Sequence, residues 1–136
     1  MASPPVVLDT DILSAIMRKN PNVLLHAREY LAEHNGFTLS LITRYEILRG
    51  LKVKKANRQL AAFDAFCSRC TILPLDDEAT NKASDIYADL SQRGLLIGDA
   101  DILIAASALV RGMSVSTNNE RHFSRISGLQ IENWLK

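Results

Sequence analysis

The chain has 136 residues, of which 47% are hydrophobic, and its formal net charge at pH 7 is +1. This length and apolar content exclude a disordered protein and allow most of the unfolded surface to be buried, so we expect a single domain over residues 1–136. The near-neutral charge excludes a globally basic nucleic-acid binder, so any contact with nucleic acid must come from a local patch.

In the first half of the chain, short strands alternate with helices. The predicted elements are a strand over 6–9, a helix over 12–17, a helix over 23–33, a strand over 37–40, a helix from about 43 to 51 and a helix over 56–70. The helices follow from helical spacing of apolar residues, and the all-apolar first strand suits a parallel sheet. Thr10 or Asp11 is expected to cap the first helix, and Thr43 and Glu46 stand at capping-box spacing.

The second half continues this alternation. The predicted elements are a strand over 71–75, a helix from Asp76 or Asp77 to Arg93, a helix over 100–111, a strand over 114–117 and a possible strand over 129–131. Pro74 indicates a strand end or a sheet edge, and Gly94 and Gly112 are expected to end helices. The helix over 100–111 is apolar nearly all round, which predicts a central, buried position.

Strands separated by helices predict βαβ units. The expected fold is therefore α/β: a three-layer α/β/α sandwich around a central, mainly parallel sheet of about four or five strands. In such sheets, ligands bind beyond the carboxyl ends of the strands. Asp9 stands at one such end and the segment 117–119 at another, so both are expected near a binding site.

Carboxylates stand where the apolar elements begin or end. These acids are Asp9 after the first strand, Glu46 in the segment TRYEILRG, and Asp99 and Asp101 at the start of the apolar helix. Acids in such places are costly to desolvate unless a cation compensates their charge. A cluster of them predicts a bound hard cation such as Mg²⁺ and, with it, phosphate chemistry.

Each acid also has a simpler interpretation when it is taken alone. Asp9 or Asp11 can cap a helix, and Glu46 can lie on a solvated helix face. Asp99 and Asp101 can complement a helix dipole, and paired asparagines after a strand can form a turn. These interpretations do not explain why the acids belong to three elements that a parallel fold can bring to one sheet edge.

Four segments of the chain match known motifs in the same order. They are LDTDILS at 8–14, T-x-x-E-I-x-x-G at 43–50, I-G-x-x-D-x-x-I-A-A at 97–106, and STNN at 116–119 with Phe123, followed by Gly128-Leu129 and the tail Glu132-Asn133-Trp134. In these segments the chain resembles PIN-domain ribonucleases, specifically the VapC-type toxins of bacterial toxin–antitoxin pairs. The resemblance spans essentially the whole chain, and four motifs in order at these spacings are specific.

The resemblance implies roles for individual residues. Asp9 and Asp101 match metal-binding acids, and Glu46 matches the glutamate of the second motif. Asn119 stands where many PIN domains have a fourth acid, and Asp99 is an extra acid that is a candidate for the missing charge. The candidate ligands of Mg²⁺ or Mn²⁺ are Asp9, Glu46, Asp99 and Asp101, and Asn119 joins them as a candidate catalytic residue. Asp11, where the family often has Asn, is interpreted as a cap or a supporting residue.

These residue types suit the hydrolysis of an RNA phosphodiester. Mg²⁺ or Mn²⁺ held by carboxylates lowers the pKa of bound water and shields charge in the transition state. Because Mg²⁺ binds through only one or two direct carboxylates, three acids and an amide suffice for one ion. Hydroxyl side chains that can support the ligands or the scissile phosphate are Thr10, Ser40, Thr43 and Thr117. The sequence does not identify the RNA.

A local basic patch suits nucleic acid. Its five cations are Arg49, Lys52, Lys54, Lys55 and Arg58. Such a patch can give sequence-independent, salt-dependent affinity for phosphates, or it can be a solvated helix and loop. No aromatic ladder accompanies it, so the sequence does not predict base stacking. The family resemblance also implies a cognate VapB-like antitoxin that covers the acidic site, and a homodimer.

Other functions fit the sequence less well. A Mg²⁺-dependent phosphatase would use Asp9 and Asp11 as a D-x-D loop, but the partner lysine and cap domain are not evident. A non-catalytic PIN-like module that binds RNA or protein would not need intact acids. A redox role for Cys67-x-x-Cys70 fails because the pair lies in a helical pattern, so we expect reduced thiols. With no apolar run of about 18 residues and no signal peptide at 1–5, we expect a cytoplasmic protein.

Overall fold

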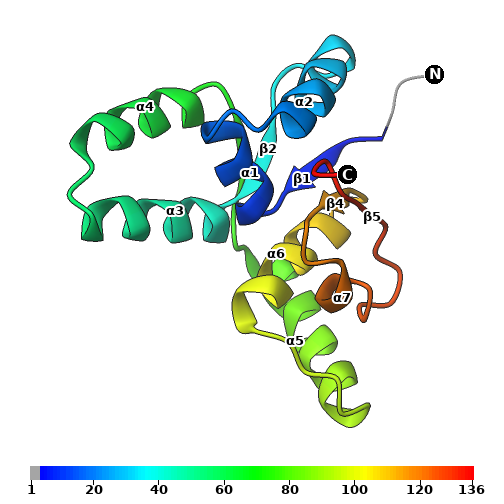
Figure 1. Cartoon of the computed structure of the whole chain (residues 1–136). Coiled ribbons are helices and arrows are strands. Elements are labelled where there is room, and N and C mark those ends of the chain that lie inside the picture. Colours follow the sequence, from blue (N-terminus) through cyan, green and yellow to red (C-terminus); the bar gives the residue numbers. More distant parts are fainter. Residues whose placement is uncertain (1–3) are drawn as a thin grey trace.

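The computed structural model describes residues 4–136, so residues 1–3 of the segment considered above for a signal peptide lie outside it. A sheet of five parallel strands forms its centre, in the order β3-β2-β1-β4-β5 (Figure 1). The strands are β1 (Val6–Leu8), β2 (Thr38–Ser40), β3 (Thr71–Leu73), β4 (Ser114–Ser116) and β5 (Ile131–Glu132). The predicted parallel sheet is confirmed, and β3, which precedes Pro74, lies at an edge of the sheet as expected.

Helices cover both faces of this sheet. They are α1 (Thr10–Met17), α2 (Pro21–Glu33), α3 (Leu41–Val53), α4 (Asn57–Cys67), α5 (Asp77–Gln92), α6 (Asp99–Leu109) and α7 (Glu120–Phe123). Alternate residues of a strand point to opposite faces. Accordingly, Leu8 packs in one hydrophobic cluster with α1, α2 and α4, whereas Val7 packs in another with α5 and α6. The predicted three-layer sandwich follows from this division.

The apolar helix α6 occupies the buried position that its sequence predicts. Its residues Ile104, Ala105 and Ala106 have no exposed surface. On the other face, α3 and α4 contact each other and form an arm that projects from the sheet (Figure 1). Trp134 near the C-terminus is buried in the first cluster, where its ring stands 5.4 Å from that of Tyr30.

Two predicted helix starts were wrong. The N-cap of α1 is Asp9, whose carboxylate accepts a hydrogen bond from Thr10 N, and not Thr10 or Asp11. The N-cap of α3 is Ser40, whose hydroxyl accepts from Ile42 N at 3.1 Å. Ser40 ends β2 and also caps α3, so no residue separates these two elements, whereas Asp9 is the single residue between β1 and α1. Consequently Thr43 and Glu46 lie inside α3 and form no capping box.

Two glycine turns and the cysteines agree with the sequence. Gly94 and Gly112 follow α5 and α6 with φ of +68° and +66°, the left-handed region that favours glycine. Cys67 ends α4, Cys70 lies beyond it, and both are free thiols. Burial raises the pKa of both thiols, that of Cys70 to about 11, which opposes the thiolate that redox chemistry needs.

Among residues 4–136, no helix combines the length and apolar content needed to cross a membrane.

Candidate active site

Asp9 lies at the carboxyl end of the central strand, buried between the ends of its two neighbours. Its backbone N–H donates to Ser116 O at 2.9 Å, which places it beside β4. Its carboxylate accepts from Thr10 N at 2.8 Å and from the Thr117 hydroxyl at 2.7 Å. The side chain is only 5% exposed. The fold therefore holds one buried acid at the sheet edge where the sequence predicts a site.

The surroundings of Asp9 disfavour its charge. The pKa of Asp9 is raised from 3.8 to about 7, mainly by burial and also by the carboxylates of Asp11 and Asp101. The hydrogen bonds from Thr117 and Thr10 oppose this rise because they stabilise the anion. A nearby cation would remove the repulsion among these acids and keep Asp9 ionised at neutral pH.

Asp11 links the first helix to the loop after β4. Its Oδ2 accepts from Asn118 N at 3.0 Å. Its Oδ1 is buried and has no hydrogen-bond partner within residues 4–136. Burial also raises the pKa of Asp11, and the charge of Asp101 adds to that rise. Asp11 therefore holds the loop after β4 with one oxygen, while its other oxygen has no protein partner within residues 4–136.

Asp101 joins this group from the first turn of α6. Its Oδ2 lies 3.2 Å from Asn119 Nδ2, which donates to it. Asn119 N in turn donates to the Thr117 hydroxyl at 2.9 Å, and that hydroxyl donates to Asp9. Asp9, Thr117, Asn119 and Asp101 are thus connected by one chain of hydrogen bonds, which brings together residues from β1, β4 and α6.

His122 belongs to the same group, although the sequence gives no indication of it. Its Nδ1 lies 2.9 Å from Asn119 Nδ2 and 3.3 Å from Asp101 Oδ2. One ring nitrogen cannot accept from Asn119 and donate to Asp101 in the same protonation state, so these two contacts are alternatives. The helix α7, which places His122 three residues after Asn119, was not predicted.

Glu46 lies on α3 and is linked to the site by a contact with the first helix, α1. Its Oε1 accepts from the Thr10 hydroxyl at 2.7 Å, and that hydroxyl also lies 3.2 Å from the hydroxyl of Thr43. Its Oε2 lies 3.7 Å from a guanidinium nitrogen of Arg49. Thr10 follows Asp9 directly in the chain, so this hydrogen bond links Glu46 to the residue next to the buried acid. Thr10, Thr43 and Thr117 therefore make the supporting contacts expected of them, whereas Ser40 only caps α3.

Asp99 is placed differently from the other acids. It is exposed at the first position of α6 and lines a hollow together with Thr80, Ser84 and Tyr87 of α5. The carboxylates that raise the pKa of Asp9 are those of Asp11 and Asp101, and Asp99 is not one of them. The structure thus brings Asp9, Asp101 and Asn119 together, links Glu46 to them only through Thr10, and leaves Asp99 facing the neighbouring helix.

The donor set suits a hydrated hard cation. No three Asp, Glu, His or Cys side chains of residues 4–136 are close enough to hold an ion directly as a group. Mg²⁺, however, keeps several waters and uses one or two carboxylates. Two observations mark an uncompensated negative site: the buried Oδ1 of Asp11 has no partner within residues 4–136, and burial together with neighbouring carboxylates raises the pKa of Asp9. The residues present therefore fit a divalent ion that is bound partly through water.

The predicted basic patch lies on the projecting arm. All five cations are exposed, at the end of α3, in the turn that follows and at the start of α4. Arg49 alone among them contacts the acidic site, through Glu46. The arm therefore presents positive charge beside the acids, which suits a polyanion that has to reach them.

Comparisons with known proteins identify the family of the chain. The PIN domain family model matches residues 6–129. The chain is 34% identical over 131 residues to "Ribonuclease VapC2" of Rickettsia felis, covering 96% of this chain and 98% of the relative. It is 35% identical over 130 residues to the "tRNA(fMet)-specific endonuclease VapC" of Salmonella typhimurium, covering 94% and 96%.

Two solved structures have a similar fold. A chain in the crystal structure of VapBC2 from Rickettsia felis bound to a promoter DNA fragment has a TM-score of 0.84 at 32% identity, with 95% of this chain and 98% of that chain covered. A chain in the DNA-bound VapBC structure from Salmonella typhimurium has a TM-score of 0.85 at 32% identity, with 97% and 99% covered. With a family model that matches nearly its whole length, the chain belongs to the PIN domain family.

Proposed function

We propose that this protein is a metal-dependent endoribonuclease toxin that hydrolyses RNA phosphodiester bonds and is neutralised by a cognate VapB-like antitoxin. The observation that carries the proposal is the buried Asp9, connected through Thr117 and Asn119 to Asp101 at the carboxyl edge of the sheet. Relatives named as VapC ribonucleases, and similar chains in VapBC complexes, support it.

In this mechanism the protein's residues hold a divalent ion and orient it toward the scissile phosphate. Asp9 and Asp101 are the proposed ligands, and Glu46 and Asn119 complete the site through water or substrate contacts. When bound, Mg²⁺ or Mn²⁺ lowers the pKa of an attacking water and shields the charge on the phosphate. Thr117 and Thr10 hold the Asp9 carboxylate in place, and Asn119 and His122 restrain that of Asp101.

The first test is cleavage of RNA by the purified protein. Asp9→Asn and Asp101→Asn keep side-chain volume but remove ligand charge, so each is expected to abolish cleavage in Mg²⁺ or Mn²⁺. Asp85→Asn, which changes an exposed acid on α5, is the matched control and should cut RNA like the wild type. If Asp9→Asn cuts as fast as the wild type, the proposed mechanism is refuted.

The role of Asp99 distinguishes two possible assignments of the metal ligands. We propose that Asp99 complements the dipole of α6 and is not a ligand, because it is exposed and faces α5. Asp99→Asn should then retain nearly full cleavage and toxicity. A loss as large as that of Asp101→Asn would instead make Asp99 the extra acid of the metal site.

The substrate and partners are proposed at the level of class. Sequencing RNA ends after induction of the toxin in cells would identify the substrate and test activity together. Co-expression with the cognate antitoxin should restore growth. We further propose that residues 1–136 act as a single cytoplasmic domain that forms a homodimer, which sedimentation of the purified protein would test.

A further inference from the structure

His122 places an imidazole nitrogen among the carboxylates of the site. Its Nδ1 lies 3.3 Å from Asp101 Oδ2 and 2.9 Å from Asn119 Nδ2. The chain has three histidines, and the other two, His26 and His34, belong to α2 and its C-cap. His122 therefore adds to this site a type of donor atom that the candidate carboxylate ligands lack.

The amide of Asn119 fixes the direction of the imidazole lone pair. Its Nδ2 carries two hydrogens and lies close to two acceptors, Asp101 Oδ2 at 3.2 Å and His122 Nδ1 at 2.9 Å. An arrangement that uses both hydrogens makes Nδ1 an acceptor and leaves the ring proton on Nε2. The lone pairs of Nδ1 and of the Asp101 oxygen then point to the same small region, which a cation can occupy in place of the amide hydrogens.

The separation of these two acceptor atoms suits neighbouring ligands of one ion. Ligands about 2.1 Å from an ion lie about 3.0 Å apart in an octahedral arrangement and about 3.4 Å apart in a tetrahedral one. His122 Nδ1 and Asp101 Oδ2 are 3.3 Å apart. The pair therefore has the spacing of two ligands side by side, one nitrogen and one oxygen.

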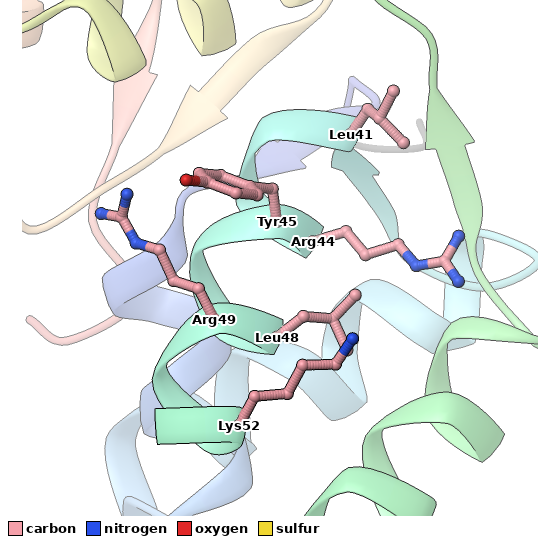
Figure 2. A pocket seen from close by; sticks show the side chains of 6 residues that line it. All are labelled: Leu41, Arg44, Tyr45, Leu48, Arg49 and Lys52. Atoms are coloured by element: carbon pink, nitrogen blue, oxygen red, sulfur yellow. The ribbon is translucent and has the colours of Figure 1, made fainter. Parts of the chain in front are cut away.

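No fixed cation of the protein competes for this pair. Among residues 4–136, Asp101 forms an ion pair with His122 and with no lysine or arginine. The cations on α3 are placed elsewhere, because Figure 2 shows Arg49 and Lys52 lining a separate hollow, and Arg49 contacts Glu46. The charge of Asp101 is therefore left for a bound ion to compensate.

We propose that His122 Nδ1 and Asp101 bind the divalent ion side by side, and that the nitrogen ligand makes the site prefer a transition-metal ion such as Mn²⁺ to Mg²⁺. Imidazole nitrogen suits first-row transition ions, whereas Mg²⁺ takes oxygen ligands and keeps its waters. The His122 side chain is 41% exposed, so Nε2–H can donate to water. This inference rests on the proposed metal-dependent function, and it selects between two ions that the acids alone do not distinguish.

Spin-echo spectroscopy of bound Mn²⁺ tests the nitrogen bond directly. Mn²⁺ would be added to the metal-free wild type at less than one equivalent, and the modulation of the electron spin echo would report nuclei bonded to the ion. We expect modulation from nitrogen, with frequencies that change when only histidine carries ¹⁵N. His122→Asn should lose this signal. His26→Asn is the matched control and should keep it, because His26 lies beside other acids, Glu29 and Glu33, outside the site.

The ratio of two affinities separates a ligand from a structural contact. Calorimetric titration with Mn²⁺ and with Mg²⁺ would be carried out on the wild type and on His122→Asn. This variant should weaken Mn²⁺ binding about tenfold or more and Mg²⁺ binding much less, so the preference for Mn²⁺ shrinks. Loss of a merely structural contact would weaken both ions equally. His122→Gln is a second variant and should give the same result.

Several results would overturn the proposal. They are bound Mn²⁺ without nitrogen modulation, modulation that persists in His122→Asn, and equal losses of Mn²⁺ and Mg²⁺ affinity in both variants. A wild type that binds no Mn²⁺ would overturn it together with the metal site. Failure of the proposed ribonuclease function would look different, because the wild type would then cut no RNA although its bound Mn²⁺ shows the nitrogen bond.

Discussion

Asp9 combines a buried carboxylate, two hydrogen-bond donors and two neighbouring acids. Its position could be predicted from the sequence because a polar residue directly after a buried parallel strand must lie at the sheet edge. The direction of a side chain at a helix start could not be predicted. Asp99 and Asp101 are two residues apart in the first turn of α6, so they point to different sides, and only Asp101 reaches Asn119. His122 was missed because the short helix α7 that carries it was not predicted.

The raised pKa of Asp9 makes the metal-free protein less stable as pH rises. The unfolded carboxyl ionises near 3.8 and the folded one near 7, so the folded state keeps a proton that the unfolded state has lost between these values. In EDTA, the contribution of Asp9 to the free energy of unfolding should be fully present below pH 3.8. As the pH rises to 7, the free energy of unfolding should fall by at most about 4 kcal/mol. Urea denaturation at a series of pH values would measure this.

Asp9→Asn supplies the control for the pH series. The amide does not titrate, so this variant should lose most of the wild-type pH dependence and be the more stable protein above pH 7. Groups that do not interact with Asp9 contribute equally to both proteins and cancel in the comparison, whereas Asp11, which is coupled to Asp9, does not. Parallel curves for the two proteins would contradict the assigned pKa of Asp9.

At the scale of elements, most helices and strands agree with the sequence to within a few residues, but the connections do not. Ser40 both ends β2 and caps α3, and Asp9 alone separates β1 from α1, so these connections are shorter than the sequence suggests. The short α7 escaped prediction because four residues show no apolar period. Apolar spacing thus fixes where long helices lie, while the cap that begins each one depends on the strand before it.

Gly36 and Gly50 give opposite predictions for the same substitution. Gly36 has a φ of +102°, and a Cβ there would lie 2.9 Å from Arg69 O, so Gly36→Ala should destabilise the protein by roughly 1–3 kcal/mol. Gly50 lies inside α3 with open space around it, so Gly50→Ala should stabilise by about 0.5–1 kcal/mol. Thermal unfolding of both variants would check the pair, and equal shifts would show that the turn at Gly36 tolerates a side chain.

At the scale of the whole molecule, the sheet order places the acids from three elements at one edge. This much was predictable, because parallel strands align their carboxyl ends. The order itself was not, since the sequence does not say which strands become neighbours. The observed order makes β1 central, and therefore buries Asp9 more deeply than an edge strand would.

Divalent metal should stabilise the assembled protein. An ion that binds only the native state raises stability, by about 2.7 kcal/mol at a hundredfold excess over its dissociation constant. Mg²⁺ or Mn²⁺ at millimolar levels should therefore raise the melting temperature of the wild type, and this rise should be small for Asp9→Asn and unchanged for Asp85→Asn. Calorimetry would detect it, and a wild-type melting temperature that ignores metal would argue against a clustered site.

The hydrogen bond between Asp9 and Thr117 joins residues that are 108 positions apart in the chain. During synthesis, Asp9 therefore emerges from the ribosome long before Thr117, Asn119 and the strand that holds them. A nascent or prematurely ended chain carries the first acid without its partners. For a protein proposed to cut RNA in the cell that makes it, this order of synthesis delays a complete cutting site until residues 117–119 have been made.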